Sequence, residues 1–166
     1  VREVDPVIPL RPTGACARIS AYSNSGRVNA VHPAILVDSG DCKMGTLYAL
    51  ALGSRPLALG FISSMRYDAV TLGNHEWDYT PRGLAGMIAL AQSSFAFSTP
   101  IVASNMDLHG NSDLAPFFGS GKAIRSTYVE QLPNGLKVGF LGRMGGQAAI
   151  AAPPSAPGTF APLASR

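Results

Sequence analysis

The stretch YDAVTLGNHEWDY, residues 67–79, decides the fold because a mostly apolar run ends there and a cluster of polar residues follows directly. The run DAVTLG at 68–73 is short and ends in glycine, which is typical of a strand buried on both faces. An amide, an imidazole and two carboxylates then lie between Asn74 and Asp78. This pattern predicts a buried strand that carries reactive side chains at its carboxyl end.

Helical and extended patterns alternate on either side of this strand. Thr13 can cap a helix that is expected to run to about Ser25, where Gly26 would end it. Another begins at Thr80, which is expected as the N-cap, with Pro81 as the first helical residue. Further helices are expected over 45–52 and 55–66, strands over 34–40 and 100–105, and a hairpin over 123–142 that turns at Asn134 and Gly135.

This alternation predicts an α/β fold with a mostly parallel sheet flanked by helices and a C-terminal hairpin. The length of 166 residues suits one domain over 1–166. Within it, residues 1–12 are expected to form a loop, residues 13–141 the core and residues 142–166 an irregular tail. Residues 107–123 are polar and rich in glycine, so they are expected to form a second loop.

The composition limits the partners of the chain. The net charge is +3 and the basic residues are scattered, which argues against a nucleic-acid partner. No apolar run is long enough for a membrane span. Cys16 and Cys42 are expected to be two separate thiols. Only 14% of the residues are charged, so some apolar surface is expected to face a partner or another part of a longer chain.

Two strand ends are expected to meet at one edge of the sheet. Asp41 follows the strand over 34–40, and Asn74 and His75 follow the strand over 68–73. In open sheets of this kind, active groups gather on the loops after the carboxyl ends of the strands. Carboxylate, amide and imidazole groups suit Mn, Zn, Fe or Mg rather than metals that prefer thiolates. Two such cations roughly 3.5–4 Å apart can bind a phosphate group and activate water.

The segments VDSGD at 37–41 and GNHEWD at 73–78 resemble the GD and GNH[DE] motifs of the calcineurin-like metallophosphoesterases. Two further segments, TGACARISAYSN at 13–24 and PIVASNM at 100–106, are similar to the 5′-nucleotidase and cyclic-nucleotide phosphodiesterase branch of that family. The resemblance covers most of residues 13–141. It implies a partial metallophosphoesterase sandwich, a site for two divalent metal ions, and hydrolysis of a small-molecule phosphoester that is expected to be a nucleotide.

The resemblance also implies roles for four side chains. Asp41 would bridge the two metal ions, and Asn74 would bind the second of them. His75 would contact the phosphate and stabilise the transition state or assist the leaving group. Asp78 would accept a hydrogen bond from His75, which would fix the tautomer of the imidazole and keep it cationic. No role is assigned to Glu76.

Three other residues near these motifs carry local expectations. Asp38 is expected to cap or pair locally, and Trp77 is expected to pack over its loop rather than bind a base. Asn105 ends the strand over 100–105, and its position fits either a residue that lines the site or a strand-end turn.

The chain departs from the family at the ligands of the first metal ion. It contains no Gly-His-x-His segment, and its one Asp-x-His stretch, DLH at 107–109, lies after the two motifs rather than before them. Its histidines other than His75 are His32 and His109. The resemblance therefore implies a parent chain with further flanking strands and a C-terminal substrate domain, and little or no activity for this segment alone. The alternatives are a truncated or degenerate domain with a binding or structural role, and a phosphoesterase that acts on a non-nucleotide substrate.

Two glycine-rich stretches are expected to be loops without a site of their own. FFGSGKAI at 117–124 is similar to a phosphate-binding loop, but Pro116 takes the place of its first glycine and Ala123 that of its Ser or Thr. FLGRMGGQ at 140–147 follows a strand but lacks the spacing of a dinucleotide-binding loop.

Overall fold

The computed structural model describes residues 3–4, 12–13, 15–29, 33–42, 56–108, 110–152 and 159–161. The chain divides into two compact units, Val1–Ala34 and Ile35–Arg166, and each is described by itself. The first unit contains the antiparallel strands β1 (Glu3–Val4) and β2 (Pro12–Thr13), followed by the helix α1 (Ala15–Asn29). The expectation that residues 1–166 form one domain stays a prediction.

The helix α1 confirms the helical pattern of this region but ends later than expected. It continues through Gly26 to Asn29. A glycine typically ends a helix by turning the backbone to a positive φ, and Gly26 is not among the residues with a positive φ. The expected end at Gly26 was therefore wrong.

The second unit is built on a parallel sheet in which the two motif-bearing strands are neighbours. The strands β3 (Val37–Asp38), β4 (Ala69–Thr71), β5 (Ile101–Val102) and β7 (Ile124–Arg125) form a four-stranded sheet in this order. Each pairing is parallel. The carboxyl ends of β3 and β4 therefore bring the loops that follow them to one edge of the sheet.

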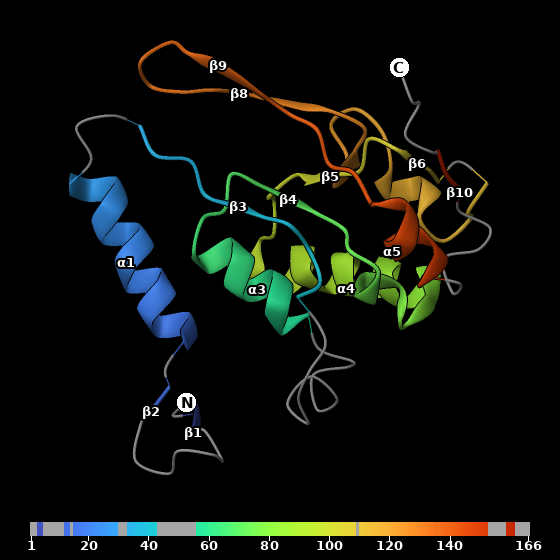
Figure 1. Ribbon diagram of the computed structural model, residues 1–166, viewed down its shortest axis with the longest axis horizontal. Helices are drawn as coiled ribbons and strands as arrows, with labels where there is room; N and C mark the ends of the chain where they lie inside the picture. The colour runs from blue at the N-terminus through green and yellow to red at the C-terminus, as the bar shows by residue number, and fades with distance from the viewer. Residues whose placement is uncertain are drawn as a thin grey trace. The chain divides into compact units, whose positions relative to one another are not determined.

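Two helices cover one face of this sheet (Figure 1). The helices α3 (Leu57–Ser64) and α4 (Thr80–Phe95) lie side by side and bury apolar side chains, among them Leu59 on α3 and Ile88 on α4. These side chains join those of the strands in one apolar core, which includes Val70. The α/β fold with a parallel sheet flanked by helices is confirmed. The helix expected over 45–52 lies outside the described residues.

The start of α4 differs from the expected cap. The short 3-10 helix η1 (His75–Trp77) leads almost directly into α4, and Tyr79 rather than Thr80 is the N-cap residue. Thr80 already belongs to the helix and has a φ of 65°. This left-handed backbone at Thr80 is not the extended conformation that an N-cap residue typically adopts, so the expectation that Thr80 is the N-cap was wrong.

The remaining described elements extend the second unit beyond the parallel sheet. The strand β6 (Met106–Asp107) pairs with β10 (Thr159–Phe160), and the 3-10 helix η2 (Ala115–Phe117) lies between β6 and β7. The strands β8 (Tyr128–Gln131) and β9 (Lys137–Phe140) form the expected hairpin, whose turn contains Gly135 with a φ of +86°. The helix α5 (Gly146–Ile150) falls in the region expected to be irregular. No helix in the described ranges is long and apolar enough to cross a membrane.

Asn105 joins segments that are distant in the sequence. Its buried side chain donates a hydrogen bond from Nδ2 to the carbonyl oxygen of Met144 (2.9 Å) and accepts one at Oδ1 from the N–H of Met144 (3.0 Å). Its own carbonyl oxygen accepts a hydrogen bond from the N–H of Ala161 (2.7 Å). Of the two readings that the sequence left open, these contacts favour a structural role at the strand end.

We expect Asn105→Ala to lower the free energy of unfolding by about 2–3 kcal/mol, because the N–H and carbonyl groups of Met144 would stay buried without their partner. Denaturant unfolding measures this loss. Asn134→Ala is the matched control, because the side chain of Asn134 bonds the N–H of Leu136 in an exposed turn, and its expected cost is below about 1 kcal/mol. Equal losses in the two variants would contradict the structural role of Asn105.

Candidate metal centre

Two glycines allow the loops after β3 and β4 to touch. Gly40 has a φ of +89°, and a Cβ atom at this position would lie 2.4 Å from the backbone nitrogen of Gly73. A Cβ atom on Gly73 would lie 2.1 Å from Oδ1 of Asp41. Neither position can carry a side chain in this arrangement. The glycines that precede Asp41 and Asn74 in the two motifs are thus required for the loops to approach.

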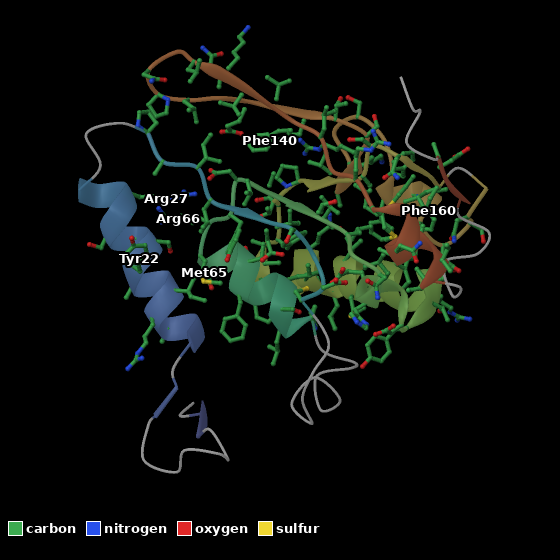
Figure 2. The ribbon with its side chains drawn as sticks, in the orientation of Figure 1. Tyr22, Arg27, Met65, Arg66, Phe140 and Phe160 are labelled. Carbon is green, nitrogen blue, oxygen red and sulfur yellow. The ribbon has the colours of Figure 1, made fainter. Side chains whose placement is uncertain are left out.

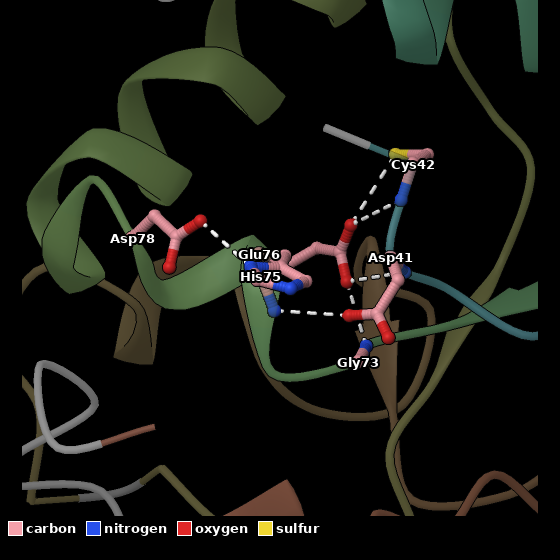
Figure 3. A network of polar contacts seen from close by, with 6 residues as sticks. All are labelled: Asp41, Cys42, Gly73, His75, Glu76 and Asp78. Atoms are coloured by element: carbon pink, nitrogen blue, oxygen red, sulfur yellow. Dashed lines mark hydrogen bonds and ion pairs between the residues drawn. The ribbon is translucent and has the colours of Figure 1, made fainter. Parts of the chain in front are cut away.

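The buried carboxylate of Glu76 joins the two loops (Figure 3). Its Oε2 accepts hydrogen bonds from the backbone N–H groups of Asp41 (2.9 Å) and Gly73 (2.6 Å). Its Oε1 accepts hydrogen bonds from the backbone N–H of Cys42 (2.9 Å) and from the thiol of the same residue (3.3 Å). Hydrogen bonds to a carboxylate are stronger than those between neutral groups. This side chain therefore fixes the position of one strand-end loop relative to the other.

Asp41 is held through both its backbone and its side chain. Its φ is 60°, a value that few residues other than glycine adopt, and its N–H is bound by Glu76. Its Oδ1 accepts a hydrogen bond from the backbone N–H of His75 (2.9 Å). Because Asp41 is exposed, the structure presents a carboxylate in a fixed orientation to solvent at the edge of the sheet.

His75 and Asp78 form the side-chain pair that the sequence led us to expect. Nδ1 of His75 lies 3.0 Å from Oδ2 of Asp78. This hydrogen bond raises the pKa of His75 above its usual value, although desolvation lowers it, and the charges of Asp78, Asp41 and Glu76 add to the rise. With Nδ1 turned toward Asp78, Nε2 is the ring nitrogen that can meet a ligand.

Asp41 and Asn74 offer oxygen atoms that fit a hard divalent cation. Asn74 precedes η1 and is half-buried, and its carbonyl oxygen accepts a hydrogen bond from the N–H of Trp77 (3.2 Å). Carboxylate and amide oxygens are ligands of Mg and Mn. Among the residues that the structure describes, no group of three or more His, Cys, Asp or Glu side chains could hold a metal ion. The described residues therefore suit such an ion without completing its coordination.

Other residues near the two motifs have local roles. Oδ1 of Asp38 accepts a hydrogen bond from the N–H of Gly40 (2.8 Å), which confirms the expected local cap. Trp77 is fully buried and packs edge-to-face against Phe160, with ring centroids 5.9 Å apart. Figure 2 labels Phe160, which belongs to β10. Trp77 therefore has a packing role, as expected. His32, His109 and the side chain of Cys16 lie outside the described residues.

Glu76 is the site residue that sequence reasoning missed. One signal for it was present, because Glu76 stands three residues after Gly73 and its carboxylate reaches back to the N–H of that glycine. This is the spacing at which a glutamate caps the start of a helical turn. The contacts to Asp41 and Cys42 could not be found in the same way, since they join residues 34 and 35 positions apart.

Known proteins similar to this chain are named apyrase and 5′-nucleotidase. No family model matches the chain. An apyrase from Anopheles gambiae is 32% identical over 110 residues, which cover 66% of this chain and 18% of that protein. A snake venom 5′-nucleotidase from Crotalus adamanteus is 32% identical over 111 residues, covering 61% of this chain and 18% of that protein. The chain thus spans less than a fifth of the length of these two relatives.

Solved structures share the fold of the chain. A 5′-nucleotidase precursor from Thermus thermophilus matches with a TM-score of 0.72 and 26% identity, covering 92% of this chain and 27% of that chain. The NAD nucleotidase of Haemophilus influenzae matches with a TM-score of 0.64 and 21% identity over 81% of this chain and 24% of its own, which shows a likeness of fold. These matches confirm the fold and the family resemblance expected from the sequence.

We expect Glu76→Gln to loosen the contact between the two loops, because an amide offers one acceptor oxygen where the carboxylate offers two. The expected loss in free energy of unfolding is about 1–3 kcal/mol. Amide hydrogen exchange should also become faster at Asp41 and Cys42. Glu130→Gln is the matched control, because Glu130 lies on the hairpin and its carboxylate is bonded by the hydroxyl of Tyr128. Unchanged exchange at Asp41 and Cys42 in the Glu76 variant would show that other contacts hold the loops.

Proposed function

We propose that this chain contributes part of a site that hydrolyses nucleotide phosphoesters, because it belongs to the 5′-nucleotidase branch of the calcineurin-like metallophosphoesterases. The observation that carries this proposal is the Glu76 network, which holds the Asp41 carboxylate against the backbone N–H of His75 (2.9 Å). The names of the relatives, apyrase and 5′-nucleotidase, support a nucleotide as the substrate.

Asp41 and Asn74 would hold two divalent metal ions, with Asp41 between them and Asn74 on the second. Mn, Zn, Fe and Mg all suit such a donor set. When bound, these ions supply positive charge for the phosphoryl oxygens and lower the pKa of water. The contribution of the chain itself is rigidity, since Asp41 is fixed at its N–H by Glu76 and at Oδ1 by His75. A carboxylate held in this way needs little rearrangement when it binds a cation.

His75 would meet the phosphate group of the substrate through Nε2. Asp78 holds Nδ1 of the ring at 3.0 Å and so determines which nitrogen faces the substrate. A cationic imidazole in this position can donate a hydrogen bond to an oxygen that gains charge in the transition state, or pass a proton to the leaving oxygen. Asp78 would act through His75 and is therefore a positioning residue.

The described residues contain no group of three or more His, Cys, Asp or Glu side chains that could hold a metal ion. The other ligands of the metal ions would therefore come from outside the described residues. We also propose that residues 1–166 alone turn over little or no substrate, because the sequence has no Gly-His-x-His segment and no Asp-x-His segment ahead of the two motifs. The parent chain would add the missing ligands and a C-terminal domain that selects the substrate.

In a full-length protein that contains this chain, Asp41→Asn and Asn74→Ala should each lower kcat/KM for a nucleoside 5′-monophosphate with Mn²⁺ at least about 100-fold. The release of phosphate and the metal content of the purified protein measure the effect. Asp113→Asn, in an exposed loop, is the charge-matched control and should keep full activity. Full activity in the Asp41 and Asn74 variants would contradict their assignment as ligands. No turnover by the wild-type protein would favour the non-catalytic alternative.

We expect His75→Asn to lower kcat by about 10²–10⁴-fold, because general acid catalysis and charge stabilisation at the phosphate would be lost. Asp78→Asn should give a smaller loss in kcat, since the ring stays in place with a weaker hydrogen bond. Metal analysis of both variants should match the wild type. A loss of bound metal in proportion to the loss of activity would show instead that His75 is a metal ligand.

A further inference from the structure

A polar hollow lies at the amino ends of β5 and β7, away from the candidate metal centre. Its volume is about 180 Å³, and its polar lining consists of Gln92, Ser98, Thr99, Gly121, Lys122 and Arg125. Thr99 and Lys122 stand shortly before β5 and β7, whereas Asp41 and Asn74 follow the carboxyl ends of β3 and β4. Because the four strands are parallel, the hollow and the metal centre lie at opposite edges of the sheet.

The charges that line the hollow are positive. Lys122 and Arg125 supply them, and no carboxylate lines the hollow among the described residues. Among the described residues, no partner forms an ion pair with Lys122 or with Arg125. The nearby Glu130 accepts a hydrogen bond from the hydroxyl of Tyr128. Two cations that share one hollow repel each other, and an anion between them would relieve that repulsion.

Arg125 is oriented before any ligand binds. Its Nε donates a hydrogen bond to the carbonyl oxygen of Lys122 (2.8 Å), and its guanidinium carbon lies 5.1 Å from the centre of the Tyr128 ring. These two contacts hold the guanidinium group on both its edge and its face. A guanidinium fixed in this way loses little conformational freedom when its terminal nitrogens bind an oxyanion.

The loop that carries Lys122 is closed by its own backbone. The N–H of Gly119 donates to the carbonyl oxygen of Ile124 (2.9 Å), and the N–H of Lys122 donates to the carbonyl oxygen of Gly119 (3.1 Å). Gly121 has a φ of +72° and has open space on the side where a Cβ atom would stand. These bonds fix the turn that presents Lys122 at the hollow.

Neutral hydrogen-bond donors complete the lining. The hydroxyl of Thr99 belongs to a buried residue, and the hydroxyl of Ser98 and the amide of Gln92 belong to exposed ones. The end of α4 beside them is partly capped, since the N–H of Phe97 donates to the carbonyl oxygen of Ala91 (3.2 Å). The hollow thus combines two cations with hydroxyl and amide groups, which is the chemistry that recognises an oxyanion.

We propose that this hollow binds a small oxyanion of the phosphate type, separately from the candidate metal centre. The stretch FFGSGKAI, which lacks the pattern of a nucleotide-binding loop, would supply Gly121 and Lys122 to this site, and Arg125 follows it directly. The proposal does not depend on the catalytic role of the metal centre, because every contact it uses lies at the other edge of the sheet.

The test uses inorganic phosphate and a full-length protein that contains this chain. EDTA is present so that no metal ion binds phosphate at the candidate metal centre. Thermal unfolding is followed as phosphate is added, against sodium chloride at equal ionic strength. Phosphate should raise the Tm in a saturable way, as expected for a ligand of the folded state. Hydrogen exchange should slow in peptides that span residues 97–99 and 119–125.

Lys122→Gln and Arg125→Gln should each weaken phosphate binding by about tenfold or more, since each removes a charge-assisted hydrogen bond. Lys137→Gln, an exposed lysine on the hairpin, is the charge-matched control and should bind as the wild type does. The proposal is overturned if chloride stabilises the protein as much as phosphate, if exchange slows elsewhere than in the two peptides, or if all three variants bind equally. The exchange measurement on the wild-type protein needs no variant, so a variant that failed to fold would leave the test intact.

Discussion

The hydrogen bonds that converge on the buried carboxylate of Glu76 are the constraint on which the candidate site depends. A carboxylate removed from water is costly unless donors surround it, and here the donors are the N–H groups of Asp41, Cys42 and Gly73. They belong to the loops after two neighbouring parallel strands. The contacts that satisfy the carboxylate are therefore the same contacts that set the distance between the loops.

The strands and the glycines make this arrangement possible. Parallel pairing of β3 with β4 brings the two loops to one edge, and the absence of side chains at Gly40 and Gly73 lets their backbones touch. Asp41 then takes a left-handed backbone conformation, which costs of order 1–3 kcal/mol in a residue other than glycine. Its hydrogen bonds to Glu76 and to the N–H of His75 offset that cost and aim its carboxylate at solvent.

The sequence alone predicted the parts of the fold that depend on local pattern. Short apolar runs that end in glycine identified β3 and β4, and the Asn134 and Gly135 pair identified the hairpin. The errors at Gly26 and Thr80 arose because each residue was assigned from its usual preference, whereas Gly26 lies inside α1 and Thr80 inside α4. The contact of His75 with Asp78 could be predicted because the two lie three positions apart on one turn.

The role of Glu76 could be predicted only in part, since its partners at Asp41 and Cys42 become its neighbours through strand pairing. The hollow beside Lys122 was not predicted for the same reason. Its lining combines the end of α4 with the turn before β7, and no local motif of the sequence links these two regions. Both features depend on contacts between segments that are far apart in the chain.

The most direct test of the account is the anomalous difference map of crystals of a full-length protein that contains this chain, grown with Mn²⁺. A peak is expected within about 2.5 Å of an oxygen of Asp41 and of the Asn74 side chain, a distance typical of oxygen ligands on divalent cations. Glu76 should keep its hydrogen bonds to the backbone and lie outside the coordination sphere. A peak bound by Glu76, or Mn²⁺ found only at residues remote from Asp41, would contradict the account.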